Sequence, residues 1–216
     1  MATSRGPVVG AAAIGVMVLL LASCAESGHR FVKNSSEGVY FKIPRGWKFY
    51  DEDAVVKSVS PDLSPQEEDV LRQVSWNVGF DADPEPSIRH LQKLLTDHPK
   101  GRAHVAELEP AERDSVSLGY LRNLVVPVDE LLAQDESNVQ VLDRADVTHS
   151  GFHGVRFKFN VKAPESGKFV TFDQVALVDD QTSQVYLFVV SCEARCFEDN
   201  EGTIDKVVDS WTVKDN

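Results

Sequence analysis

This chain of 216 residues lacks the sequence signatures of the common catalytic centres. It contains no G-x-S-x-G nucleophile elbow, no S-x-x-K, no H-E-x-x-H and no glycine-rich phosphate-binding loop. These absences weaken the usual hydrolase and nucleotide-binding interpretations. The chain also shows no internal repeat and no long low-complexity tract. We therefore expect a protein that is not an enzyme, with no catalytic site, no metal site and no cofactor.

A net positive charge is also lacking. The formal net charge is −12, and removal of an N-terminal segment containing Arg5 would make the chain one unit more negative. An acidic protein is a poor candidate for binding nucleic acid, and anionic lipid headgroups repel it. We expect no nucleic acid partner, and we expect any attachment to a membrane to depend on something other than surface charge.

The apolar run near the N-terminus is too short for a membrane span. It extends from Val8 to Ala22, about 15 residues or roughly 22 Å of helix. A hydrocarbon core of roughly 30 Å needs about 20 residues. A basic residue, Arg5, precedes the run and small residues follow it. This three-part pattern is typical of a signal peptide that is removed.

The end of the apolar run, Leu21-Ala22-Ser23-Cys24, resembles the bacterial lipobox. The resemblance implies that residues 1–23 are a lipoprotein signal peptide and that Cys24 becomes the N-terminal residue, with diacylglycerol on its sulfur. One acyl chain binds a membrane only marginally, at about 0.8 kcal/mol per methylene, whereas two or three chains hold a protein there. We expect a protein anchored on the extracytoplasmic side of the cell membrane. The alternatives are an ordinary secretory peptide that contains a cysteine, and a single anchored helix.

Only three cysteines are present. With Cys24 assigned to lipid, Cys192 and Cys196 remain as a pair in a compartment that permits oxidation. A turn in the three residues between them brings their Cα atoms within the roughly 4.4–6.8 Å that a disulfide requires. We predict this disulfide, with two reduced buried thiols as the alternative. A redox-active pair is disfavoured because thioredoxin-like motifs have two intervening residues.

Residues 24–37 are polar and aperiodic, which predicts a lipidated tether, and residues 38–216 then form a single domain. A Ser64-Pro65-Gln66-Glu67 capping box predicts a helix over 64–71. Pro127 interrupts an apolar stripe and predicts two short helices or a kink. The expected strands are 39–43, 73–80, 139–147, 154–162, 169–178 and 185–190. The other expected helices are one over 88–95, ending before Pro99, and one from Asp199 or Asn200 that carries Ile204, Val207, Val208 and Trp211.

This order predicts an α+β fold, an antiparallel sheet of about six strands with helices on both faces. The segments VYFKIPRGW (39–47) and TIDKVVDSWTV (203–213) resemble the PsbP-like and Mog-type α/β/α sandwich. Bacterial lipoproteins of unknown role share this sandwich, and the resemblance covers about residues 38–213. It implies a protein that binds protein partners. The partner-binding residues of the family have no counterparts here, so none is carried over.

Two polar groups have spacings that metal ions use. His149 and His153 would share one face of a helix, but they flank a predicted turn at Ser150-Gly151 and have no third ligand. The alternating acids Asp81, Asp83 and Glu85 offer oxygens to calcium, but the segment lacks the length and glycine of a calcium loop. We interpret the histidines as surface residues and the acids as part of a strand-to-helix junction.

Three tryptophans, Trp47, Trp76 and Trp211, are candidates either for the core or for a ligand pocket. Their positions on an alternating strand and an amphipathic helix favour the core for Trp76 and Trp211. Trp47 follows a turn and is expected to be partly exposed.

The favoured function is a non-enzymatic, lipid-anchored protein that binds an unidentified protein of the cell envelope. One alternative is a carrier or sensor that holds a small apolar molecule between the sheet and the helical region 115–134. Another is an enzyme with an unrecognised site. A closed core beneath 115–134 would favour protein binding, and an apolar cavity of several hundred Å³ would favour a carrier. Clustered groups with strongly shifted pKa values would favour an enzyme.

Overall fold

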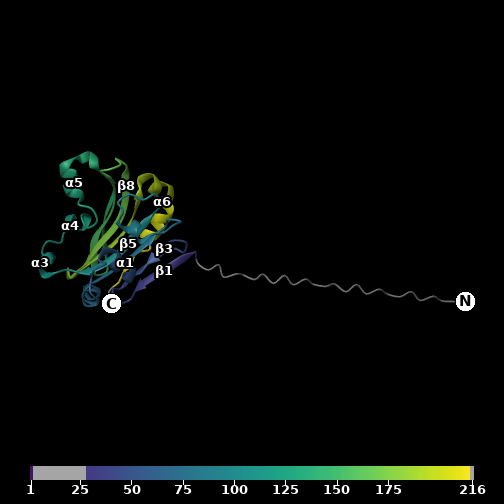
Figure 1. The fold of residues 1–216 in the computed structure, drawn as a ribbon, viewed down its shortest axis with the longest axis horizontal. Helices are drawn as coiled ribbons and strands as arrows, with labels where there is room; N and C mark the ends of the chain where they lie inside the picture. Colours follow the sequence, from purple (N-terminus) through teal and green to yellow (C-terminus); the bar gives the residue numbers. More distant parts are fainter. Residues whose placement is uncertain (2–27, 215–216) are drawn as a thin grey trace.

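The computed structural model describes residues 28–214 and Met1, so Cys24 and the predicted signal peptide lie outside the described residues. The described chain forms two antiparallel sheets with helices on both faces of the larger one (Figure 1). The predicted α+β class is confirmed. None of the described helices is long and apolar enough to cross a membrane.

The larger sheet has the strand order β3-β4-β5-β9-β8-β7-β6, and every neighbouring pair is antiparallel. Its strands are β3 (Lys48–Tyr50), β4 (Ser75–Asp81), β5 (Lys100–Glu107), β6 (Val139–His149), β7 (Phe152–Lys162), β8 (Phe169–Asp179) and β9 (Gln184–Glu193). The smaller sheet has the order β1-β2-β10, formed by β1 (His29–Asn34), β2 (Val39–Pro44) and β10 (Thr212–Val213).

Two groups of helices cover opposite faces of the larger sheet, with α4 and α5 on one side and α6 on the other (Figure 1). The α-helices are α1 (Glu52–Val59), α2 (Pro65–Val74), α3 (Pro110–Arg113), α4 (Leu118–Arg122), α5 (Val128–Gln134) and α6 (Ala194–Val208). Short 3-10 helices are η1 (Ile88–Gln92) and η2 (Glu136–Asn138). The break between α4 and α5 contains Pro127, as the sequence predicted.

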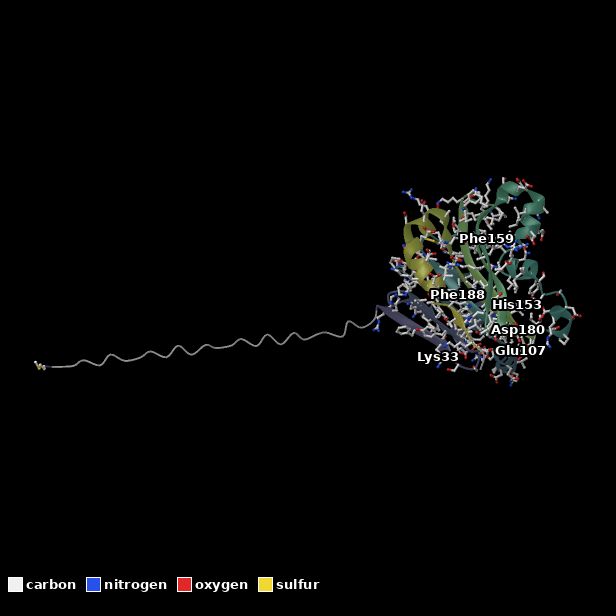
Figure 2. The ribbon with its side chains drawn as sticks, turned by 180° about the vertical axis from the view of Figure 1, so that it is seen from behind. Lys33, Glu107, His153, Phe159, Asp180 and Phe188 are labelled. Atoms are coloured by element: carbon white, nitrogen blue, oxygen red, sulfur yellow. A yellow bond between two sulfur atoms is a disulfide. The ribbon has the colours of Figure 1, made fainter. Side chains whose placement is uncertain are left out.

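The side chains of the sheet alternate between two apolar clusters, one on each face. In the cluster under α6 and the smaller sheet, the fully buried Phe188 lies 5.0 Å from Phe41, 5.7 Å from Phe80 and 5.0 Å from Trp211, measured between ring centroids. The cluster under α4 and α5 contains Phe159 and its strand neighbours. Figure 2 labels Phe188 and Phe159 inside the body of the domain.

A network of ion pairs joins the sheet to α6. Asp173 on β8 is completely buried and accepts hydrogen bonds from the Nε and Nη2 of Arg156 on β7, at 3.0 and 2.7 Å. The same guanidinium contacts Asp209 at 2.7 Å, and Lys158 lies 3.8 Å from Asp173 and 3.3 Å from Asp205. Because the buried carboxylate is paired, this burial of charge is compatible with a stable core.

Two boundaries predicted from the sequence are wrong. Residues 29–34, which we expected in the tether, form β1, so the smaller sheet begins within that segment. β1 is an edge strand on which only Val32 is buried, and its polar sequence therefore gives a weak strand signal. Residues 88–95 form only the short η1, because the backbone is extended at Lys93, whose carbonyl oxygen accepts a hydrogen bond from Lys100.

The larger sheet also departs from the expected strand count. Residues 48–50 and 100–107 add β3 and β5, while β2 belongs to the smaller sheet. The last helix begins at Ala194, earlier than expected, and ends at Val208. Trp211 therefore lies beyond that helix, where it is buried against Phe188. The four-strand meander β6–β9 and the capping box of Ser64 and Glu67 on α2 are confirmed.

Candidate functional site

A cavity of about 370 Å³ lies on the α4–α5 face of the larger sheet, and we refer to it as the main cavity. Its floor is made by β4, β5 and β9, and its walls come from α1, η1 and the link between α4 and α5. The lining residues are Val55, Ser58, Val59, Asn77, Val78, Leu91, Gln92, Lys93, Leu94, Lys100, Gly101, Arg102, Val125, Val126, Phe172, Val189 and Ser191. The volume is within the range of roughly 300–1,000 Å³ for small-molecule sites.

The alternation of β5 places its polar residues on the cavity face. Lys100, Arg102 and His104 follow one another at every second position, so their side chains share that face, while Ala103 and Val105 are buried in the opposite cluster. Arg102 pairs across the sheet with Gly79 and lines the main cavity.

The walls of the main cavity are mostly apolar. Leu91 of η1 packs so closely on Gly79 that a Cβ there would collide with its Cδ1. Leu91 and Leu94, two of the apolar residues that the sequence suggested for a helix over 88–95, thus line the main cavity. The apolar lining residues are Val55, Val59, Val78, Leu91, Leu94, Val125, Val126, Phe172 and Val189.

The charged residues of the main cavity are all cations. Lys93, Lys100 and Arg102 line it, and no aspartate or glutamate does so among residues 28–214. Lys100 is buried and donates a hydrogen bond to the carbonyl oxygen of Lys93. Burial, followed by repulsion from Arg102, lowers the pKa of the Lys100 ammonium to about 8, so Lys100 is mostly protonated at neutral pH.

Arg102 has no carboxylate partner within the part of the chain that the structure describes. Its residue surface remains open to water, yet burial by surrounding protein lowers the pKa of its guanidinium. Both observations are compatible with a side chain that lines the main cavity and is partly exposed to water. The guanidinium remains charged at neutral pH because its ordinary pKa is far above that range.

A second hollow of about 310 Å³, the side cavity, adjoins the main cavity through Asn77 and Arg102. Its wall includes His104 and Tyr120, and it contains two acids, Glu107 and Glu112. The Oδ1 of Asn77 and the Nδ1 of His104 are buried there without a hydrogen-bond partner among the described residues. Burial lowers the pKa of His104 to about 4, so its ring is neutral at pH 7.

The histidines and acids considered as metal ligands do not come together. Among residues 28–214, no group of three or more histidine, cysteine, aspartate or glutamate side chains is placed to hold a metal ion. His149 and His153 flank the β6–β7 turn, and His153 lies 3.6 Å from Asp180 (Figure 2).

The acids of the DADPE segment have other partners. Asp81 accepts hydrogen bonds from the backbone N–H groups of Asp83 and Ser87, and its Oδ2 lies 2.8 Å from the Nδ1 of His90. Asp83 accepts a hydrogen bond from the backbone N–H of Glu85. The acidic segment therefore shapes the turn before η1, as expected of a strand-to-helix junction.

The tryptophans do not line the main cavity. Trp211 is buried, whereas Trp76 and Trp47 are half-buried against the same apolar cluster. Trp47 also borders a broad open depression beside β1, together with Arg30, Arg45 and Lys48.

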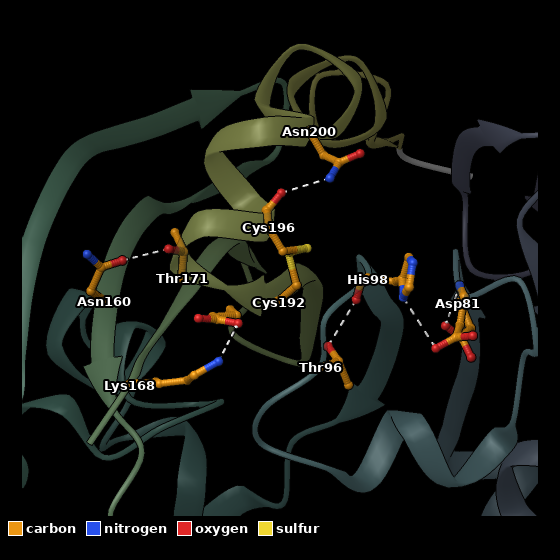
Figure 3. Close-up of a disulfide and its surroundings, with 11 residues drawn as sticks. Asp81, Thr96, His98, Asn160, Lys168, Thr171, Cys192, Cys196 and Asn200 are labelled. Atoms are coloured by element: carbon orange, nitrogen blue, oxygen red, sulfur yellow. Dashed lines mark hydrogen bonds and ion pairs between the residues drawn. A yellow bond between two sulfur atoms is a disulfide. The ribbon is translucent and has the colours of Figure 1, made fainter. Parts of the chain in front are cut away.

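The structure pairs Cys192 with Cys196 in a disulfide whose Cα atoms are 6.0 Å apart. The bridge joins the end of β9 to the first turn of α6, where Asn200 donates a hydrogen bond to the carbonyl oxygen of Cys196 (Figure 3). The N–H of Glu193 bonds to the carbonyl oxygen of Thr96, so this exit of β9 also contacts the segment after η1. The disulfide therefore fixes the strand exit rather than forming a reactive centre.

We expect Cys192→Ser/Cys196→Ser to remain folded and to lose about 2 kcal/mol or less of unfolding free energy, because the closed loop is very short. Mass spectrometry of non-reduced peptides from acid-quenched protein detects the bridge, and urea unfolding measures its effect. Two alkylatable thiols in the wild-type protein would contradict the disulfide.

Comparisons with known proteins give similarity of structure only. No family model and no curated protein matches the chain. The solved structure of CyanoP, the PsbP of the cyanobacterium Synechocystis, has a TM-score of 0.47 at 15% identity, covering 90% of this chain and 99% of that one. LpqN of Mycobacterium tuberculosis, described as involved in cell envelope biogenesis, has a TM-score of 0.43 at 13% identity, covering 87% and 91%. The Ran-binding protein Mog1p of Saccharomyces cerevisiae has a TM-score of 0.41 at 10% identity, covering 86% and 95%.

These neighbours include the PsbP-like and Mog-type folds that the sequence resembles. The low identities and scores transfer no function and no site residue to this chain. The main cavity therefore has to be interpreted from its own residues.

Sequence reasoning missed Lys100, Arg102 and His104. The stretch KGRAHVAE, residues 100–107, places a basic residue at every second position between small or apolar ones. That alternation is the one signal from which a strand with a basic face was predictable.

Proposed function

We propose that this protein is a lipid-anchored, extracytoplasmic binding protein that holds a small, largely apolar molecule in the main cavity. The main support for this proposal is the cavity itself, which has a volume of about 370 Å³ and mostly apolar walls and lies beneath the link between α4 and α5. From sequence alone we favoured binding to another protein and named an apolar cavity in this region as the feature that would favour a carrier or sensor. The geometry of the main cavity therefore favours a carrier function over a protein-binding function.

Catalysis finds less support in the main cavity than binding does. A nucleophile is activated by a base beside it or by a lowered pKa. Lys100, Arg102 and His104 do have lowered pKa values, which is the feature named above as favouring an enzyme, but none of them has the hydrogen-bonded base of a catalytic pair among the described residues. The Lys100 ammonium instead donates to a backbone carbonyl, and no carboxylate lines the main cavity among the described residues. His104, whose pKa is strongly lowered, faces the side cavity. The side chains of the main cavity are therefore better arranged for ligand binding than for catalysis.

The surface at the start of β1 supports the proposed membrane anchor. β1 begins at His29, five positions after Cys24, so a lipid on Cys24 would keep this end of the domain within roughly 18 Å of the membrane. Arg30, Arg45 and Lys48 surround the depression there, and Phe31 is 57% exposed. A basic and aromatic surface suits contact with anionic headgroups, although the whole chain is acidic.

Occupation of the main cavity can be tested with a neutral apolar fluorophore, N-phenylnaphthylamine. We expect saturable fluorescence enhancement with the wild-type chain and at least tenfold weaker binding to Val126→Trp, whose indole would fill the cavity. Val141→Trp, the same substitution on the exposed part of β6, is the matched control and should bind like the wild type. Equal binding to both variants would refute binding in the main cavity, and absence of saturable binding both of this fluorophore and of the amphiphiles named below would refute the carrier function.

Binding of an envelope protein remains a second candidate because β6 is a long exposed edge strand. Val141 and Leu142 are 55% and 50% exposed at a β-bulge in this strand. Exposed edges of this kind accept an additional strand from a partner. A photoreactive residue in place of Leu142, followed by cross-linking in intact cells and mass spectrometry, tests this candidate. Equal yields of cross-linked protein from Leu142 and from the exposed Val70 on α2 would exclude a specific contact at β6.

We predict that Cys24→Ala releases the protein from the membrane or leaves an uncleaved precursor. The reason is that the lipobox cysteine would supply the only acyl attachment point. Partition between aqueous and detergent phases, together with the mass of the N-terminal peptide, measures the result. Normal processing combined with continued partition into the detergent phase would show that the lipid assignment is wrong.

A further inference from the structure

The charge of the main cavity is opposite to that of the chain. The sequence has 34 acidic and 22 basic residues. Lys93, Lys100 and Arg102 nevertheless line the main cavity without an acidic residue among the described lining. Like charges that share a low-dielectric hollow repel one another. An arrangement of this kind is stabilised when an anion enters.

The carboxylates of the domain leave these cations unpaired. Asp81, whose negative charge raises the pKa of Lys100, already accepts two backbone hydrogen bonds and contacts His90. By contrast, Arg72 on α2 has Asp53 at 2.6 Å and Arg156 on β7 has Asp173 at 2.7 Å. Arg102 has no such contact, so its fork of donors is free for a ligand.

The apolar walls and the cations lie within the same cavity. Leu91, Val126 and Phe172 line it together with Arg102 and Lys100. A molecule that fills the cavity therefore meets hydrocarbon on its sides and a cationic floor on β5. The volume is near the lower end of the range for ligand sites, which fits one hydrocarbon chain of moderate length rather than a diacyl lipid.

On the basis of the proposed function, we infer that the ligand is a single-chain anionic amphiphile. Arg102, beside Lys100, binds its carboxylate or phosphate, and its hydrocarbon part packs on Leu91, Val126 and Phe172. Arginine suits this role because its donors match the oxygens of a carboxylate or phosphate in pairs. The apolar walls supply the remaining affinity.

Calorimetric titration of the full mature chain carrying Cys24→Ser, which needs no detergent, tests this inference. The titrants are decanoate, decyl phosphate, decanol and inorganic phosphate, all below their aggregation limits. We expect the wild-type cavity to bind at least one anionic amphiphile about tenfold or more tightly than decanol, the magnitude of one charged hydrogen-bonded contact. Comparison of decanoate with decyl phosphate distinguishes a fatty-acid source from a phosphate-headed lipid.

Arg102→Gln should abolish the preference for the anion and leave decanol affinity unchanged, and Arg102→Lys should retain part of the preference. Arg144→Gln, at an exposed arginine on β6, is the matched control and should behave like the wild type. Circular dichroism and thermal unfolding establish that each variant is folded.

The outcomes separate the inference from the proposed function. Equal binding of decanol and the anionic amphiphiles overturns the inference and leaves the carrier function standing. Binding of inorganic phosphate as tightly as decyl phosphate overturns the hydrocarbon part and indicates a site for free anions. Failure of every amphiphile and of the neutral fluorophore removes the carrier function itself.

Discussion

Phe188→Ala should lower the free energy of unfolding by about 3–5 kcal/mol, the usual cost of removing a fully buried aromatic ring. Phe188 is 0% exposed and lies at the centre of a group of rings formed by Phe41, Phe80 and Trp211. Its removal leaves a void where β2, β4, β9 and the segment after α6 meet. Because these elements come from both sheets, the surroundings have little freedom to close the void.

Urea unfolding followed by tryptophan fluorescence and circular dichroism measures this loss. Phe31→Ala is the matched control, because Phe31 is 57% exposed at the edge strand β1, and it should change stability by about 0.5 kcal/mol or less. A loss below about 1 kcal/mol for Phe188→Ala would mean that the two sheets do not share this core.

Arg156→Met should destabilise the protein by about 3 kcal/mol or more at neutral pH, because removal of one partner leaves a buried charge uncompensated. Asp173 is fully buried and receives two hydrogen bonds from Arg156. Lys158, at 3.8 Å, remains near the carboxylate and limits the loss. The exposed contacts of Arg156 with Asp205 and Asp209 add little.

The loss should depend on pH in a definite direction. Burial raises the pKa of Asp173, and Arg156 opposes that rise. In Arg156→Met the folded pKa of this carboxyl rises further above its unfolded value, so the variant loses stability as the pH increases through that interval. The difference from wild type should therefore be smaller at about pH 4 than at about pH 7.

Urea unfolding at both pH values measures this dependence, and Asp173→Asn in the Arg156→Met background should recover part of the loss. Arg144→Met, at an exposed arginine whose nearest carboxylate is 3.8 Å away, should change stability by less than about 1 kcal/mol. A loss for Arg156→Met that is the same at both pH values would mean that Asp173 does not carry an uncompensated charge in the variant.

Much of the scaffold was predictable because its local signals agree with its tertiary contacts. The strands β6–β9 alternate or are continuously apolar and are joined by short turns, and α2 carries a complete capping box. The disulfide partners followed from cysteine number and spacing. In these places packing and local preference point to the same structure.

The candidate site was not predictable, for reasons that concern particular residues. On β5 the side of the strand that normally shows apolar residues carries Lys100 and Arg102, because that side faces a cavity instead of a packed core. Leu91 and Leu94 suggested a helix face, but they line the wall of the cavity. Prediction from the alternation of apolar and polar residues assumes a packed core, so it is wrong for strands and helices that line a cavity.

The closing contacts of the domain have a consequence for the order in which it folds. The hairpins β6–β7, β7–β8 and β8–β9 join near neighbours in the chain, whereas Lys42 on β2 donates its N–H to Ser210 across 168 positions. Contacts between distant parts of a chain form slowly because a long loop must close first. β5 likewise has to insert between β4 and β9, which a newly made chain supplies only near its end. The C-terminal meander and the β1–β2 hairpin are therefore expected to form early from neighbouring residues, whereas β2 gains β10 and Ser210 only when the last residues arrive. The edge of β5 that later pairs with β9 stays open until then and depends on protection from aggregation.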